Sequence, residues 1–341
     1  MSRFDLGEPE MAQLLPGEPR YRVQQVWEGL VQQGRDIEDL TTLPKSLRAR
    51  LSAVAELQLA LTLVAESVSD DHQTIKWLWR LHDGNQVETV LMHYADRSTV
   101  CISSQAGCAM ACGFCATGQG GFQRHLTSGE IIEQVAVARS RASADGRRLS
   151  NVVYMGMGEP LANYGPVWRS VERLHDDFGL SARHLTISTV GVVPGIRRLA
   201  AEALPVNLAV SLHAADDRKR NEMVPINRTY PLAELANACE EYLAAKNRRL
   251  SFEWAMIDSV NDTPGDASQL AAYARPLGAH VNLIPLNSTP GYPTVGTGPN
   301  RVRAFRNALI DLGINATIRQ NRGTSIDAAC GQLAARHKTD T

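Results

Sequence analysis

The sequence lacks the features of a membrane-spanning or secreted protein. None of its apolar runs approaches the roughly 18 residues that a helix needs to cross a bilayer. The first residues, MSRFDLGEPEM, contain no apolar segment of the kind that directs secretion. We therefore expect a cytoplasmic protein with no membrane partner, in a compartment where cysteine thiols stay reduced.

The sequence also lacks an excess of charge of either sign. Its 35 Lys and Arg residues against 36 Asp and Glu residues give a net charge of −1, which argues against a protein that coats nucleic acid indiscriminately. Local basic segments still leave room for an RNA substrate, although any one of them is more often a solvated helix face. These segments are residues 45–50, 138–148, 301–306 and 319–322.

Cysteine is scarce, with six residues in 341, and it is unevenly placed. Four of the six fall in the stretch CISSQAGCAMACGFC, where Cys108, Cys112 and Cys115 have the spacing C-x3-C-x2-C. In a reducing compartment, clustered cysteines indicate metal ligands or catalytic thiols rather than structural disulfides. Three thiolates from one loop can hold a 4Fe–4S cluster and leave its fourth iron open to a small molecule. The alternative is a structural zinc site, in which Cys101 or His125 supplies the fourth ligand.

The beginning of the chain differs in pattern from the rest. Residues 21–34 have the apolar spacing of a helix, and residues 41–54 begin another helix after a proline-marked turn. Residues 76–94 resemble a β-hairpin with Asp-Gly-Asn at its turn. We interpret 1–95 as an RNA-binding accessory domain, mainly helical with a short strand pair, and 96–341 as the core domain with a C-terminal segment.

From about residue 98, short apolar runs alternate with helical stretches. This alternation predicts a parallel sheet with helical crossovers, and six or seven units are too few for a complete eight-unit barrel. An incomplete barrel and an open doubly wound sheet therefore remain. Polar residues favour the barrel, because four segments rich in Gly, Glu, Ser, His and Asn follow predicted strands, where barrel enzymes build their active sites. These segments are residues 155–160, 188–191, 211–213 and 286–291.

The motifs resemble those of a known family. The cysteine loop, with Phe114 before its last cysteine and a GEP segment further along the chain, resembles the radical SAM superfamily, in which SAM is S-adenosylmethionine. Over residues 76–335 the likeness extends to the RlmN/Cfr family of RNA adenine methyltransferases, and before residue 76 it is weaker. The segments that carry it are CISSQAGCAMACGFCATGQGGFQRHLTSGEI, MGMGEPLANY, SLHA, VPINRTY, VNLIPLN and RGTSIDAACGQL.

The resemblance implies an α/β fold built on a partial (β/α)6 barrel, in agreement with the number of strand–helix units. It also implies that Cys108, Cys112 and Cys115 ligate a 4Fe–4S cluster, and that the amino and carboxylate groups of SAM bind its open iron. The residues that it places in contact with SAM are Gly158, Glu159, Ser188, Ser211, Leu212, His213 and Asn287.

The resemblance gives roles to two further cysteines and to one acid. A first SAM methylates the Cys330 thiolate by displacement, and a 5′-deoxyadenosyl radical made from a second SAM takes a hydrogen from this methyl group. The methylene radical then adds to an adenine ring carbon and joins enzyme to RNA. Glu88 accepts the proton of the substituted carbon. Cys101 attacks the Cys330 sulfur and leaves a transient disulfide with Cys330.

Three functions are consistent with these residues. The first is methylation of adenosine carbon 2, in the peptidyl transferase centre of 23S rRNA and in the anticodon loop of tRNA, by a monomer that uses an electron donor such as flavodoxin. The second is methylation of carbon 8, as in Cfr-type antibiotic-resistance enzymes. The motifs are common to both branches, and we expect carbon 2 because that branch is the widespread one. The third is a zinc-stabilised RNA-binding protein without catalysis.

Overall fold

The structure is a computed structural model, and it describes residues 2–287, 289, 292, 295–320, 322–329 and 331–333. Its centre is a ten-stranded sheet with the order β1-β2-β3-β4-β7-β8-β9-β10-β11-β12. Within the described residues, neighbouring strands from β4 to β12 run parallel, whereas β1 to β4 pair antiparallel. The parallel strands are β4 (Ser98–Cys101), β7 (Leu149–Tyr154), β8 (Leu185–Thr189), β9 (Asn207–Ser211), β10 (Leu250–Met256), β11 (His280–Pro285) and β12 (Ala316–Ile318).

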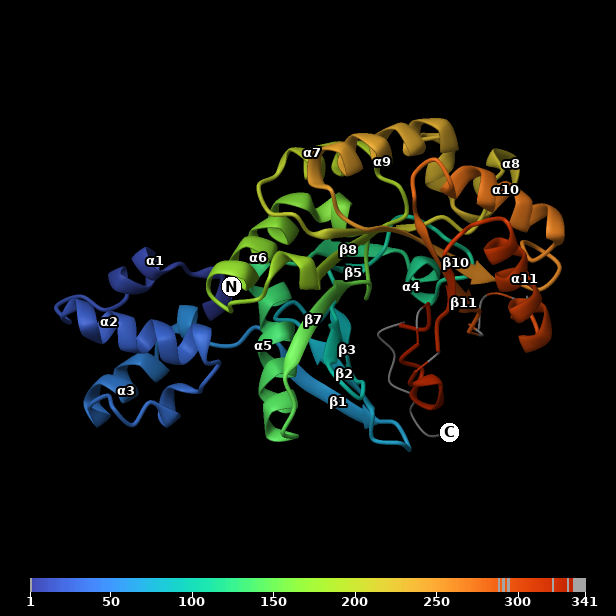
Figure 1. Ribbon diagram of the computed structural model, residues 1–341. Helices are drawn as coiled ribbons and strands as arrows, with labels where there is room; N and C mark the ends of the chain where they lie inside the picture. Colours follow the sequence, from blue (N-terminus) through green and yellow to red (C-terminus); the bar gives the residue numbers. More distant parts are fainter. Residues whose placement is uncertain are drawn as a thin grey trace.

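A helix connects each parallel strand to the next one in the sheet. Figure 1 shows these helices arranged around the outside of the strands, as right-handed crossovers require. They are α5 (Ser128–Ala144), α6 (Tyr164–Asp176), α7 (Val193–Ala201), α9 (Leu232–Lys246), α10 (Pro264–Ala274) and α11 (Pro299–Asp311). Six strand–helix units form a partial barrel, and the predicted fold class is confirmed.

The sequence specifies several helix ends directly. Thr127 caps α5, because its hydroxyl accepts the backbone N–H of Glu130 while the Glu130 carboxylate accepts the N–H of Thr127. Thr263 and Asp266 form the same reciprocal capping box at the start of α10. Shorter helices are α4 (Ala116–Gln119) and α8 (Asp217–Met223), and the short 3-10 turns are Arg3–Asp5, Ile37–Asp39, Ala55–Leu57, Pro160–Asn163, Ala182–His184, Pro225–Arg228 and Thr324–Ile326.

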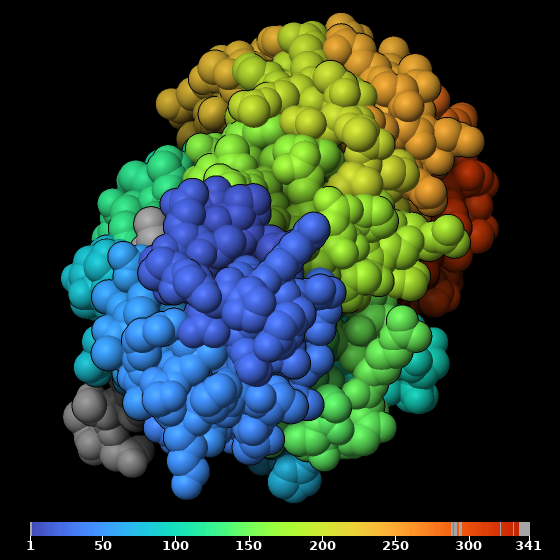
Figure 2. All heavy atoms as spheres, turned by 90° about the vertical axis from the view of Figure 1, so that its left-hand side faces the viewer, coloured from blue at the N-terminus to red at the C-terminus, as the bar shows by residue number. Residues whose placement is uncertain are grey.

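The N-terminal helices pack as a group against one flank of the core. They are α1 (Glu8–Gln13), α2 (Arg20–Trp27), a π-helical turn (Glu28–Gln32) and α3 (Lys45–Ser52). Figure 2 looks onto this flank and shows the blue N-terminal residues against green residues of the core. Glu133 of α5 fastens the group, because its carboxylate accepts hydrogen bonds from Ser2 Oγ (2.5 Å) and from the backbone N–H groups of Ala60 (3.0 Å) and Leu61 (2.9 Å).

The predicted hairpin is confirmed and belongs to a larger unit. β2 (Thr74–Arg80) pairs with β3 (Gln86–His93), and β1 (Thr62–Val68), which the sequence pattern did not predict, adds a third antiparallel strand. β3 then pairs with β4, so the sheet continues across residue 95. The division into two domains at that residue stays a prediction. A separate two-stranded sheet is formed by β5 (Gln105–Gly107) and β6 (Phe122–His125).

No helix in the described part of the chain has both the length and the apolar character needed to cross a membrane.

Candidate active site

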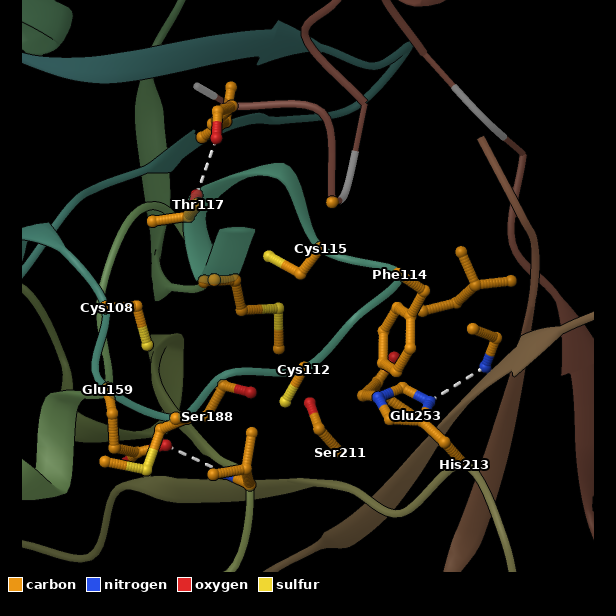
Figure 3. Close-up of a pocket in the computed structure, with 18 of the residues that line it drawn as sticks. Cys108, Cys112, Phe114, Cys115, Thr117, Glu159, Ser188, Ser211, His213 and Glu253 are labelled. Atoms are coloured by element: carbon orange, nitrogen blue, oxygen red, sulfur yellow. Dashed lines mark hydrogen bonds between the residues drawn. The ribbon is translucent and has the colours of Figure 1, made fainter. Parts of the chain in front are cut away.

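A cavity of about 160 Å³ lies at the C-terminal ends of the parallel strands (Figure 3). Nearly all of the residues that the family resemblance places at the cluster and at SAM line this cavity. They are Cys108, Cys112, Cys115, Gly158, Glu159, Ser188, Ser211, His213 and Asn287. Leu212 is the exception, because it is buried beside the cavity and is not part of its lining.

The three clustered cysteines come from the loop between β5 and α4, and their side chains face the cavity (Figure 3). The loop turns back on itself, with the N–H of Cys115 bonded to the carbonyl of Cys112 at 3.1 Å. Gly118 permits this turn, because a Cβ there would lie 2.9 Å from the Cys112 carbonyl oxygen. Burial raises the pKa of Cys108 to about 12 and also raises the pKa of Cys112. These thiols therefore ionise readily only against a positive partner such as a bound metal.

The arrangement of possible ligands differs from that of a single-ion site. In the ranges that the structure describes, no three His, Cys, Asp or Glu side chains converge closely enough to hold one metal ion. His125, a candidate fourth zinc ligand, instead pairs through Nδ1 with the Gln105 amide at 3.0 Å. Cys101, the other candidate, lines a neighbouring cavity. Three thiols spread around a common space suit a polynuclear cluster better than one tetrahedral zinc ion.

The GEP segment holds a buried carboxylate at the cavity wall. The two oxygens of Glu159 accept the backbone N–H groups of Leu161 and Val190, each at 2.9 Å. Burial raises the pKa of Glu159 to about 7. Gly158 is required beside it, because its φ is +100° and a Cβ there would lie 2.5 Å from the Cβ of Gln105.

His213 follows β9 and is held in its neutral form. Its Nδ1 accepts the backbone N–H of Ala255 at 3.0 Å, and its ring lies 4.8 Å from the ring of Phe114 in an edge-on contact. Burial and the nearby charge of Arg220 lower the pKa of His213 to about 3. The imidazole therefore offers the cavity a neutral polar edge.

Arg220 of α8 is a residue that the sequence patterns did not single out. Its buried guanidinium donates hydrogen bonds to the carbonyls of Val190 (2.6 Å), Leu212 (3.0 Å) and Ser211 (3.4 Å). Arg220 thereby fixes the backbone at the ends of β8 and β9, from which Ser188 and Ser211 reach the cavity. A single arginine in a helical stretch gives no sequence signal for this role.

Glu253 of β10 is a second residue missed by the sequence patterns. It is 4% exposed and lines the cavity (Figure 3). Its Oε1 accepts hydrogen bonds from Ser251 Oγ (3.0 Å) and Asn282 Nδ2 (2.8 Å), whereas its Oε2 is buried and has no hydrogen-bond partner among the described residues. A buried carboxylate oxygen without a partner is costly, and this one is available to a ligand with hydroxyl or amino donors.

The antiparallel strands bring two further predicted residues, Glu88 and Cys101, to one sheet face. Val90 pairs directly with Cys101 of β4 on one side and with Lys76 of β2 on the other, and directly paired residues share a face. Glu88, two residues from Val90 on the same strand, therefore also lies on that face. Cys101 lines a smaller cavity of about 20 Å³, which shares Met155, Ile284, Arg319 and Leu333 with the larger one. Cys330 lies outside the described residues.

Residues on both sides of Cys330 are anchored in this region. On one side, Arg322 donates to the carbonyl of His93 at 3.0 Å and Lys76 donates to the carbonyl of Asp327 at 3.3 Å. On the other side, the N–H of Ala116 bonds the Gly331 carbonyl at 2.8 Å, and Thr117 Oγ1 donates to the Leu333 carbonyl at 2.6 Å. The described residues of the C-terminal segment, 322–329 and 331–333, therefore connect β2 and β3 to α4, which follows the cysteine loop.

Comparison with known proteins gives consistent results. The family model of the Radical SAM superfamily matches residues 102–266. The chain is 49% identical to a protein of Chloroflexus aurantiacus named "Probable dual-specificity RNA methyltransferase RlmN", over 98% of this chain and 93% of that protein. A protein of Salinispora tropica with the same name is also 49% identical, over 98% of this chain and 92% of its own.

A solved structure is also similar over almost the whole chain. It is the crystal structure of a radical SAM methyltransferase from Sphaerobacter thermophilus, which is 48% identical in sequence. The match has a TM-score of 0.94 and covers 98% of this chain and 100% of the other.

Proposed function

Because the chain belongs to the RlmN family within the radical SAM superfamily, we propose that it methylates carbon 2 of adenosine in 23S rRNA and in tRNA. The observation that carries this proposal is the single cavity at the strand ends, which gathers three cysteine thiols, Glu159 and the strand-end polar residues. The substrates come from the family resemblance, and the name "dual-specificity" of the relatives supports two RNA substrates.

The donor set in the cavity fits a 4Fe–4S cluster. Cys108, Cys112 and Cys115 would hold three irons, since thiolates are the ordinary ligands of such clusters. Bound here, such a cluster would exchange single electrons, one given for the cleavage of SAM and one accepted from the radical adduct.

The remaining cavity wall fits SAM. We assign the amino group of SAM to Glu159, whose carboxylate is held by the N–H groups of Leu161 and Val190. Glu253 would take hydroxyl or amino donors of the nucleoside through Oε2, which has no partner in the part of the chain that the structure describes. The other proposed contacts are Gly158, Ser188, Ser211, Leu212, His213 and Asn287.

The two thiols outside the cluster would carry and release the methyl group. Cys330 would accept a methyl group from one SAM. This methyl group would lose one hydrogen atom to the 5′-deoxyadenosyl radical made from a second SAM, and the resulting methylene radical would add to the adenine ring carbon. Glu88 takes the proton of the substituted ring carbon. The Cys101 thiolate attacks the Cys330 sulfur, so that a sulfur–sulfur bond forms while the bond between that sulfur and the methylene carbon breaks. The carbon leaves with the electron pair, gains a proton and becomes the methyl group, and a reductant must reopen the disulfide.

RNA would reach the cavity through single-stranded or flipped bases, because a ring carbon is inaccessible within a stacked helix. We propose that residues 1–95 form an accessory part that binds RNA. We also propose that the enzyme is a cytoplasmic monomer and that it receives electrons from a donor of the flavodoxin type.

Nucleoside analysis of rRNA and tRNA tests the function. A strain that lacks this gene should lose 2-methyladenosine from both RNAs, and the plasmid-borne gene should restore it, whereas the Cys330→Ala variant should not. Persistence of 2-methyladenosine in the deletion strain would refute the proposal. Restoration of 8-methyladenosine instead would assign the enzyme to the carbon-8 reaction.

Metal analysis separates this function from that of a zinc-stabilised RNA-binding protein. Anaerobically purified protein should be brown and hold about four irons per chain. Substitution of any one of Cys108, Cys112 and Cys115 by Ala should remove most of the iron. A colourless protein with one zinc ion per chain would contradict the assignment.

A further inference from the structure

Lys76 of β2 is a largely buried cation on the sheet face that carries Cys101 and Glu88. Its side chain is 12% exposed, and that of Glu88 is 2% exposed. A lysine is rarely buried to this extent unless it has a partner that offsets the loss of hydration. The structure gives Lys76 two partners. One is the proposed base, Glu88, and the other lies in the segment that carries Cys330.

The first partner is Glu88 on the neighbouring strand. The Lys76 Nζ lies 3.2 Å from Glu88 Oε1. The strand register accounts for this contact, because Lys76 pairs with Val90 and Leu78 pairs with Glu88, so that the lysine and the glutamate are diagonal neighbours on one face. The ion pair fixes the position of the Glu88 carboxylate on this face of the sheet.

The second partner is the C-terminal segment. The same Nζ donates a hydrogen bond to the backbone carbonyl of Asp327 at 3.3 Å. Asp327 lies three residues before Cys330 and has a left-handed backbone, with φ of +50°. Gly323 approaches the same strand so closely that a Cβ there would lie 2.9 Å from Thr74 Cγ2. The segment is therefore seated on β2 with its carbonyl aimed at the lysine.

We propose that Lys76 is a positioning residue that aligns the Glu88 carboxylate and, by binding the Asp327 carbonyl, links this alignment to the docked C-terminal segment. One ammonium group contacts both the base and the chain that bears the methyl carrier. The base is thus held in place when the segment that brings the RNA adduct is docked. This inference rests on the proposed function, specifically on proton removal by Glu88.

Lys76 is needed for one step of the proposed reaction and not for the two steps before it. Methylation of Cys330 and formation of the RNA adduct use the cavity and do not require Glu88 as a base. Only the release of the adduct requires proton removal from the ring carbon. Loss of Lys76 should therefore leave the first two steps in place and slow the third, which differs from the uniform loss expected of a residue that only supports the fold.

The experiment follows each step in anaerobically reconstituted protein with SAM and an RNA hairpin substrate. The variants are Lys76→Met, Lys76→Gln, Lys76→Arg, Glu88→Gln and the double variant Lys76→Met/Glu88→Gln. Mass spectrometry of the protein measures methyl on Cys330, a denaturing gel measures the protein–RNA adduct, and nucleoside analysis measures the product. Arg169→Met is the control, because Arg169 is an exposed cation on α6, outside the proposed RNA-binding part.

We expect Lys76→Met and Lys76→Gln to carry methyl on Cys330 and to accumulate the adduct. The rate of adduct release should fall by about 10- to 100-fold, which is less than the full contribution of a positioned general base. Lys76→Arg, which keeps the charge, should retain most of the rate. The double variant should be no slower than Glu88→Gln, because Lys76 acts through Glu88. Arg169→Met should behave as the unchanged protein.

Release of the adduct by Lys76→Met at the unchanged rate would overturn the inference. A double variant in which the slowing by Lys76→Met multiplies the slowing by Glu88→Gln would also overturn it. It is equally overturned if Lys76→Met and Lys76→Gln lose Cys330 methylation in parallel with their melting temperature, since Lys76 would then only support the fold. If Glu88→Gln itself forms no adduct, or releases it normally, the proposed role of Glu88 fails. An adduct in Glu88→Gln but none in Lys76→Met would leave the proposed function intact and remove only the role of Lys76.

Discussion

His213 lies in the cavity wall, where burial and the nearby charge of Arg220 hold its imidazole neutral. Its pKa is about 3 in the folded protein, against about 6.5 for an unfolded histidine. Above pH 6.5 the imidazole is neutral in both states. As the pH falls below 6.5, the unfolded chain gains a proton that the folded protein cannot take up, so the free energy of unfolding decreases.

This difference in pKa predicts that the folded protein loses stability in acid, and that the His213→Asn variant loses less. Each pH unit between about 6.5 and 3 should cost about 1.4 kcal/mol of stability through this residue. Urea unfolding at pH 7.5 and pH 5.5 measures it. Asn offers an oxygen in place of Nδ1, so the variant should lose about 1 kcal/mol less than the unchanged protein between the two pH values. Equal losses would show that His213 is not held neutral.

Glu253 leads to a second prediction at the scale of a residue. Its buried Oε2 has no partner among the described residues, and SAM offers hydroxyl and amino donors. Replacing a charged acceptor by an amide should weaken SAM binding by about 10-fold or more. Equilibrium dialysis with labelled SAM measures Glu253→Gln against Glu240→Gln, which removes an exposed carboxylate on α9. Equal affinities of the two variants would exclude Glu253 from the SAM site.

Sequence reasoning predicted some site residues and missed others for a physical reason. Cys108, Cys112 and Cys115 are close in the chain, so their spacing alone indicates a metal loop. Lys76 and Glu253 act through contacts that depend on strand register and on segments far away in the chain, as the bond from Lys76 to Asp327 illustrates. A single sequence, taken without an alignment, gives no signal for such contacts.

At the scale of elements, the C-terminal segment depends on a few hydrogen bonds. Thr117 at the start of α4 is buried, and its hydroxyl donates to the Leu333 carbonyl at 2.6 Å. Thr117→Val keeps the shape, removes the donor and leaves the carbonyl without this partner, at a cost of about 1 kcal/mol. Hydrogen exchange in peptides from the C-terminal segment should become several-fold faster.

The control for this prediction is Thr41→Val, since Thr41 is exposed in the N-terminal helical region. Exchange in the same peptides should not change in that variant. Unchanged exchange in Thr117→Val as well would show that the hydrogen bond does not hold the segment.

Helices and strands were predicted correctly where the sequence pattern that specifies them lies within a few neighbouring residues. The alternation of strands and helices predicted the parallel sheet, and the Asp-Gly-Asn turn predicted the β2–β3 hairpin. The helix expected over 21–34 instead changes to a π-helical turn at Glu28–Gln32, where Gly29 lies tightly against Leu40. That change depends on tertiary packing, which periodicity does not report.

At the scale of the whole molecule, one continuous sheet connects two parts of the proposed chemistry. The partial barrel provides the cavity with the cysteine loop and the strand-end residues, and the antiparallel strands β2 and β3 provide Lys76 and Glu88. The unit count predicted the barrel. The addition of β1 to β3 to the same sheet was not predicted, because antiparallel edge strands carry no signal for the strand they join.

The central claim is that the methyl group passes through Cys330 as a methylene, and isotope transfer tests it most directly. The enzyme is incubated with RNA and SAM whose methyl group carries three deuterium atoms, and mass spectrometry counts the deuterium in the methyladenosine. One deuterium should be lost to 5′-deoxyadenosine and replaced by a proton, so the product should keep two. A product that keeps all three would show direct methyl transfer and contradict the account.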